Sequence, residues 1–134
     1  MSEENVKIAR RANAAFNDGD LAAVEAMYAQ DVEWRDFTHA PDVPEVVNGI
    51  DAVMELWADW LAVFDEFRCD VDEYVDAGDW VVTVAHWHGS GAGSGVSVDL
   101  HQADAFEIQG GKVVRVVLAY GSKDEALEAV GTPE

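Results

Sequence analysis

Residues 96–120 read VSVDLHQADAFEIQGGKVVRVVLAY, and this stretch decides the fold. Apolar and polar residues alternate from about Val96 to Ile108, which predicts a strand with one buried face. Gly110-Gly111 predicts a tight turn. The run from Lys112 to about Tyr120 is so rich in valine that it predicts a strand buried on both faces. Together these residues predict an antiparallel hairpin.

A second hairpin precedes the first. Period-two patterning covers residues 67–75 and 80–88, with a turn at 77–79 between them. The glycine-rich residues 89–95 cannot hold a regular strand, so we expect them to form a flexible connection between the two hairpins. The second half of the chain therefore predicts a meander of four strands.

The first half of the chain is mostly helical in pattern. Residues 2–16 predict a helix that stops at Asn17-Asp18-Gly19, and Asp20 caps a second helix whose inner stripe includes Tyr28. Residues 32–36 alternate as a strand, residues 38–44 form a proline-containing loop that we expect to move, and residues 50–64 predict an amphipathic helix. Ser122 caps a short last helix. Helices before a strand meander predict one α+β domain over residues 1–134, with the helices on one face of a mainly antiparallel sheet.

Charge and composition exclude several classes of partner. Eight Lys and Arg against 27 Asp and Glu give a net charge of -19, which repels phosphate backbones and anionic headgroups, so we expect no nucleic-acid or membrane partner. The scattered acids predict a surface adapted to concentrated salt, and hence a halophilic organism. Cys69 is the single cysteine, and the sequence shows neither a secretory signal pattern nor a membrane-length apolar run. We expect a cytoplasmic protein.

Four strings of residues occur in an order that is typical of one superfamily. They are FNDGDL (16–21), YAQDVEW (28–34), NGIDAV (48–53) and DAFEIQGGKV (104–113). With them the chain resembles the nuclear-transport-factor-like cone superfamily, which includes the ketosteroid isomerases and the SnoaL-like polyketide cyclases. The resemblance implies a strongly curved sheet wrapped around the helices, with a pocket for a small apolar molecule in the cone.

The resemblance also implies catalytic positions. By comparison with ketosteroid isomerases, Asp36 matches the general base and Asp104 matches the carboxylic acid of the oxyanion hole. The oxyanion tyrosine falls at Ala12, so only another donor, such as Tyr28 or Tyr120, would replace it. The acid of the cyclases is also missing, because that stretch reads Val116-Val117-Leu118. Three functional hypotheses stay open: an isomerase- or cyclase-like enzyme acting on a carbonyl compound, a non-catalytic pocket, and a dimerisation scaffold.

Strand alternation gives independent support to both acids. Asp36 shares parity with Trp34, and Asp104 shares parity with the apolar Phe106, so both carboxyl groups are expected inside, where desolvation perturbs an acid. The alternative is a structural hydrogen bond in each case. We expect the pocket wall among Trp34, Trp57, Trp60, Leu61, Phe64, Gln102, Phe106, Leu118 and Tyr120. The helical members of this set, Trp57, Trp60, Leu61 and Phe64, are more often plain core.

Histidines raise the question of a metal. His86 and His88 share one face of a strand and His101 lies on the next strand, on a face that the resemblance places outside the cone, where relatives often dimerise. We therefore expect a homodimer through this face. Zinc sites need three or four converging ligands, and no cysteine or fixed spacing supports one, so we expect no metal and no cofactor. His39, in the loop, is expected in solvent.

Overall fold

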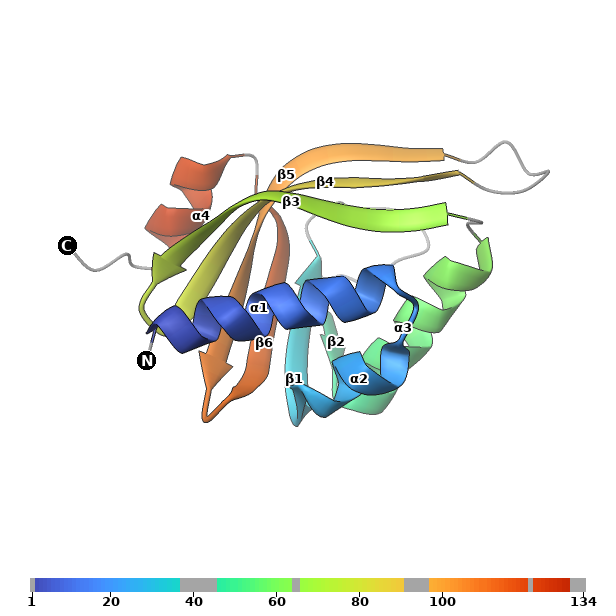
Figure 1. The fold of residues 1–134 in the computed structure, drawn as a ribbon, viewed down its shortest axis with the longest axis horizontal. Coiled ribbons are helices and arrows are strands. Elements are labelled where there is room, and N and C mark those ends of the chain that lie inside the picture. The colour runs from blue at the N-terminus through green and yellow to red at the C-terminus, as the bar shows by residue number, and fades with distance from the viewer. Residues whose placement is uncertain (1, 37–45, 64–65, 91–96, 121, 131–134) are drawn as a thin grey trace.

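The computed structural model describes residues 2–36, 46–63, 66–90, 97–120 and 122–130 (Figure 1). Along the chain, the elements are α1 (Ser2–Asn17), α2 (Leu21–Ala26), β1 (Tyr28–Asp36), β2 (Val46–Asn48), α3 (Ile50–Val63), β3 (Glu66–Ala77), β4 (Trp80–Ser90), β5 (Ser97–Gln109), β6 (Lys112–Tyr120) and α4 (Lys123–Ala129). The α+β class is confirmed. The predicted proline loop and residues 91–95 of the glycine-rich connection lie outside the described residues. Gly89 and Ser90, which were predicted to belong to that connection, instead end β4, because they pair with Val98 and Ser97.

The strands form one curled, unclosed sheet. Within the described residues its order is β2-β1-β6-β5-β4-β3, and every neighbouring pair is antiparallel except β1 with β6. In Figure 1 the sheet bends around α1, and α2 and α3 lie toward its β1 end. Both predicted hairpins are present, whereas β2, which has three residues, was missed by the sequence patterns because so short a strand has no measurable period.

Local signals explain where the elements begin and end. The Asp20 carboxylate accepts a hydrogen bond from the Ala23 amide at 3.2 Å, and Ser122 caps α4 through the Glu125 amide at 3.2 Å. Tyr28 was predicted on the second helix, but it begins β1. The reason is pairing with the sheet, since the Met27 carbonyl accepts the Val113 amide at 2.9 Å.

Two core clusters lie on opposite faces of the sheet. The larger one fills the space between the inner face and the helices α1, α2 and α3, with Val32, Val53 and Val116 fully buried. The smaller one packs Ala126 of α4 against Val82 and Ala105 on the outer face. The helices that precede the strand meander pack on the inner face, as predicted, whereas α4, which follows the meander, lies on the outer face. Among the described residues, no helix is long and apolar enough to cross a membrane.

Irregular pairing of β6 with β5 decides which side chains enter the cone. Ala103 pairs with Tyr120 and Ala105 with Val117, so β6 has one extra residue between these pairs, as in a β-bulge. An extra residue reverses the alternation of a strand. Leu118 belongs to the inner core, whereas Tyr120 packs against the outer cluster beside α4.

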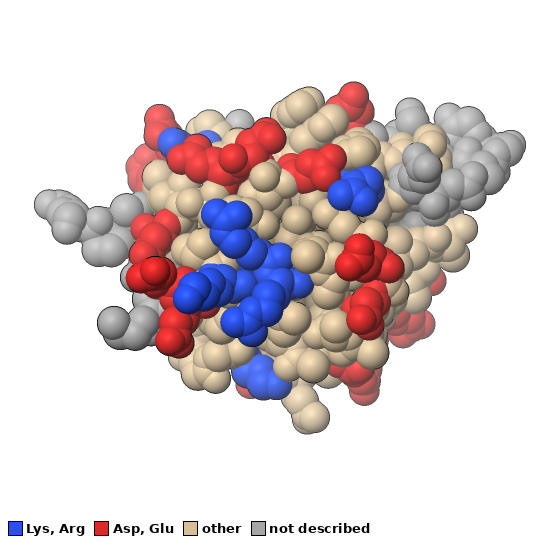
Figure 2. All heavy atoms as spheres, viewed as in Figure 1, with Lys and Arg blue, Asp and Glu red and all other residues tan. Residues whose placement is uncertain are grey.

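Charges are unevenly distributed over the surface. Figure 2 shows Lys and Arg side chains gathered in the middle of the face that carries α1, with acidic side chains around them. Lys7, Arg10 and Arg11 are exposed on this helix, and the Arg10 guanidinium lies 4.3 Å from the centre of the Tyr74 ring, a cation–π contact. The acidic excess thus belongs to the remainder of the surface.

Candidate functional site: the interior of the cone

An aromatic cavity of about 40 Å³ lies between α1, α3 and the inner face of the sheet. Trp34 and Tyr28 line it from β1, Trp57 from α3, and Trp87 and Phe106 from β4 and β5. The Trp57 ring packs against three other rings, with centroids 5.1 Å from Tyr28, 5.6 Å from Trp34 and 6.1 Å from Phe16. All three pairs are edge-to-face, the arrangement that aromatic quadrupoles favour. The rings therefore hold one another in fixed orientations.

Asp104 is enclosed completely, with 0% of its surface exposed. The Trp87 indole Nε1 donates to its Oδ2 at 2.7 Å, and the Gln102 amide Nε2 donates to its Oδ1 at 2.7 Å. Each oxygen thus accepts a short hydrogen bond, which holds the carboxyl group and the Trp87 ring in place. Asp104 does not itself line the described cavity, because Trp87 lies along its wall.

Tyr28 brings a hydroxyl group into this apolar space. Burial raises the pKa of Tyr28, and the nearby Cys69 and Asp104 raise it further, so the phenol keeps its proton and can donate it in a hydrogen bond. In the part of the chain that the structure describes, no residue hydrogen-bonds this hydroxyl. Ala12, where the resemblance implies a tyrosine, lines the same cavity. Tyr28 on β1 and Ala12 on α1 thus line the same cavity.

Cys69 connects α1 to β3 at the rim of the cavity. Asn13 and Asn17 donate to its carbonyl at 3.1 and 2.9 Å, and its amide donates to Asn17 Oδ1 at 2.8 Å. Burial raises the pKa of the Cys69 thiol, with Asp104 and Asp70 adding to the effect. No local sequence signal marks these two asparagines as anchors, since Asn13 fits the helical stripe and Asn17 fits the helix stop.

Asp36, the predicted general base, ends β1. Its backbone pairs with Leu118 of β6, and the side chain lies outside the described part of the residue. Asp104 lies on β5, the next strand beyond β6, at nearly the same level of the sheet. Two strand spacings separate the two backbones by about 10 Å. That Asp36 points into the cone stays a prediction.

The other predicted wall residues fall into three groups. Trp34, Trp57 and Phe106 line the cavity, Leu118 is buried in the inner core, and Gln102 contacts Asp104. Leu61 is half-buried, and the side chains of Trp60 and Phe64 lie outside the described residues. Tyr120 belongs to the outer cluster, because the β6 bulge turns it away from the cone.

Comparisons with known proteins find a family model that matches most of the chain. The family model of the SnoaL-like domain matches residues 9–116. No curated protein matches the chain significantly.

Solved structures share the fold at low sequence identity. Bal32a, from a soil-derived mobile gene cassette, has a TM-score of 0.81 at 18% identity, over 95% of this chain and 96% of that one. A hypothetical protein of ketosteroid isomerase-like fold from Catenulispora acidiphila, in complex with trimethylamine, has a TM-score of 0.72 at 19% identity, over 94% of this chain and 93% of that one. TerC, co-crystallised with polyporic acid, has a TM-score of 0.75 at 20% identity, over 92% of this chain and 97% of that one.

Proposed function

Because the chain belongs to the SnoaL-like domain family, we propose that its cone binds a small apolar molecule with one carbonyl group and that Tyr28 donates a hydrogen bond to the carbonyl oxygen. The observation that carries this proposal is the Tyr28 hydroxyl, which lies in an apolar cavity without a hydrogen-bond partner among the described residues. An acceptor oxygen of a ligand in the cavity would give this donor a hydrogen-bond partner in apolar surroundings.

The size of the cavity restricts the ligand. Pockets that bury drug-sized molecules have roughly 300–1,000 Å³, whereas this cavity has about 40 Å³. A ligand must therefore be small or must displace part of the wall, for which half-buried Tyr74 and Phe106 are the best candidates. The structural neighbours in complex with trimethylamine and with polyporic acid are examples of this fold crystallised with small organic molecules.

The chemistry proposed for the bound carbonyl is proton transfer at the adjacent carbon. Asp36 would remove the proton as general base, and the Tyr28 hydroxyl would stabilise the developing enolate oxygen. Asp104 differs from the role that the resemblance implies, because its two oxygens accept hydrogen bonds from Trp87 and Gln102. We assign it to holding the Trp87 wall, with electrostatic influence on Tyr28.

Binding is tested with cyclohex-2-enone and with cyclohexene, which lacks the carbonyl. Tyr28→Phe should weaken binding of the enone up to about tenfold, the value of one net hydrogen bond, and leave cyclohexene unaffected. Tyr74→Phe is the matched control, since Tyr74 also lines the cavity. Tryptophan fluorescence measures both affinities. Equal affinity of wild type and Tyr28→Phe for the enone would refute the assignment of Tyr28.

Catalysis needs a separate measurement. The wild-type protein in D2O should exchange the α-protons of the bound enone, followed by NMR, and Asp36→Asn should abolish the exchange. Binding without exchange would favour the alternative of a non-catalytic pocket. An unchanged rate in Asp36→Asn would remove Asp36 from the mechanism.

Homodimerisation through the outer face and adaptation to salt also remain proposals. Support for them comes from the resemblance and from the net charge of -19. Light scattering in molar potassium chloride measures the first, and a monomer contradicts it. Unfolding midpoints in dilute buffer and in molar salt measure the second, and equal midpoints contradict it.

A further inference from the structure

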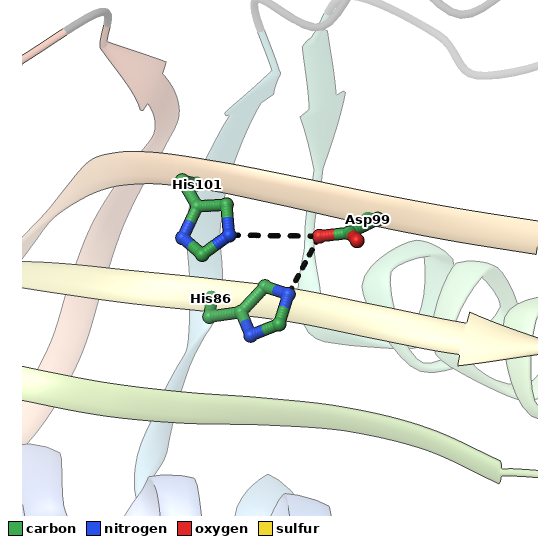
Figure 3. A group of neighbouring side chains, drawn as sticks. All are labelled: His86, Asp99 and His101. Atoms are coloured by element: carbon green, nitrogen blue, oxygen red, sulfur yellow. Dashed lines mark hydrogen bonds and ion pairs between the residues drawn. The ribbon is translucent and has the colours of Figure 1, made fainter.

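Three potential metal ligands converge on the outer face of the sheet (Figure 3). His86 lies on β4, directly across from His101 on β5, and Asp99 lies two residues before His101 on the same strand face. The Asp99 Oδ1 lies 2.6 Å from His86 Nε2 and 3.6 Å from His101 Nε2. The two imidazole rings are stacked, with centroids 4.1 Å apart and planes 7° from parallel.

The spacing of the donor atoms suits one ion. One donor atom from each of the three residues lies within 4.8 Å of the other two. Ligand atoms about 2.0–2.1 Å from a zinc ion are at most about 4.2 Å apart. The lone pair of each ring nitrogen lies in the ring plane, so binding requires the stacked rings to rotate until both planes meet at the ion. Two imidazoles and one carboxylate are the ligand set of zinc and similar transition metals, whereas magnesium and calcium prefer oxygen ligands alone.

The backbone beneath the cluster is regular. The β4–β5 ladder runs from Trp80 opposite Glu107 to Ser90 opposite Ser97 without a register shift. Continuous pairing fixes the Cα positions of all three ligands, so binding an ion requires only their side chains to move. The net charge of -19 also raises the local concentration of cations.

Solvent reaches the three side chains, so water can complete the coordination of a bound ion. The side chains of Asp99 and His101 are 73% exposed and that of His86 is 30% exposed, so an ion has direct access. His88, whose ring centroid is 4.6 Å from that of His86, bonds instead to Asp70 of β3 at 2.6 Å. The neighbouring His88–Asp70 pair thus has one imidazole and one carboxylate, while the cluster has a second imidazole.

We propose that His86, Asp99 and His101 bind one divalent transition-metal ion of the zinc class, with solvent completing the coordination. The ion joins β4 to β5 on the face opposite the cavity. Asp99 converts the histidine pair into a three-ligand site. The site does not depend on the function proposed for the cone, since no ligand is shared between the two faces.

The test is calorimetric titration of chelator-treated protein with zinc chloride. We expect one ion per chain for the wild type, and an affinity at least about 100-fold lower for His101→Asn, since even outer-shell changes cost 10–100-fold. His88→Asn is the matched control and should bind as the wild type does. Absence of zinc binding, or an equal loss in His88→Asn and His101→Asn, would overturn the assignment.

A second readout is independent of calorimetry. Zinc should raise the thermal unfolding temperature of the wild type, because a ligand that binds only the folded state stabilises it. Asp99→Asn should remove this rise while leaving the circular dichroism of the metal-free protein unchanged, since the residue is exposed. An undiminished rise in Asp99→Asn would contradict the ligand set, and magnesium chloride should produce no comparable rise.

Discussion

The two faces of the β4–β5 hairpin each carry an aspartate, but in opposite surroundings. Asp104 and Asp99 lie five positions apart on β5, an odd number, so they point to opposite sides of the sheet. The first is fully enclosed and bonded to Trp87 and Gln102, and the second is 73% exposed beside two histidines. The comparison teaches that the role of an acid in this chain follows from strand parity.

The largest difference between the faces should appear on removal of a tryptophan. Trp57 is 1% exposed and contacts three aromatic rings, so Trp57→Ala should cost about 4 kcal/mol in free energy of unfolding. Trp80 packs half-buried against the outer cluster, and Trp80→Ala should cost about 2 kcal/mol. Urea unfolding followed by circular dichroism measures both. Equal costs would mean that the inner core is no better packed than the outer one.

The next difference concerns the two acids. Asp104→Asn replaces one acceptor oxygen with a donor facing Trp87 or Gln102, and an unsatisfied buried group should cost about 2 kcal/mol. Asp99→Asn, on the surface of the same strand, should change the free energy of unfolding of the metal-free protein by about 0.5 kcal/mol or less. The same urea titration compares them. If Asp104→Asn is as mild as Asp99→Asn, the inner hydrogen bonds contribute little.

Alkaline pH should weaken the inner face. Burial raises the pKa values of Cys69 and Tyr28, whose ordinary values are 9.0 and 10.0. Because the folded chain retains protons that the unfolded chain releases, their stabilisation is complete below about pH 9 and declines as the pH rises above it.

Cys69→Ala should therefore flatten the decline of the unfolding midpoint above pH 9, and Tyr28→Phe should flatten it above pH 10, near the ordinary pKa values of 9.0 and 10.0. Thermal unfolding at a series of pH values measures both effects. A decline as steep in both variants as in the wild type would show that other groups control alkaline unfolding.

The smallest effect is expected at the hydrogen-bonded pair of Asp70 and His88 on the outer face. The hydrogen bond from His88 lowers the pKa of Asp70, with Arg68 also contributing. A lowered folded pKa stabilises the protein above the ordinary value of 3.8, and this stabilisation is lost as the pH falls. Since Asp70 is exposed to solvent, Asp70→Asn should cost about 0.5 kcal/mol or less at pH 6. The difference from wild type should shrink toward pH 3, and a constant difference would point to packing.

Much of the fold could be predicted from local patterns. Caps at Asp20 and Ser122, glycine turns and strand alternation are properties of a few neighbouring residues, so they can be recognised in the sequence. The start of β1 at Tyr28 could not be predicted, because pairing of Met27 with Val113 competes with the helical pattern. Nor was the position of α4, which depends on a patch of Val82, Ala103 and Ala105 assembled from two strands.

The candidate site was predictable in part. Parity and resemblance identified Asp104 as an inner residue, and named Tyr28 as one possible replacement for the donor missing at Ala12. The partners of Asp104 were not deduced in full, since Trp87 comes from a different strand. Tyr120 was the other candidate donor, and the bulge in β6 moves it to the outer face.

The sequence by itself determined the class, the order of the helices and of every strand except β2, the acidic surface and the inward parity of Asp104, because each depends on composition or on near neighbours. Only the tertiary structure decided that Tyr28 shares a cavity with Ala12, that Tyr120 leaves the cone, and that Asp99 meets His86 and His101. These outcomes depend on register between strands. Register is set by bulges and by packing across the whole sheet, which no local pattern contains.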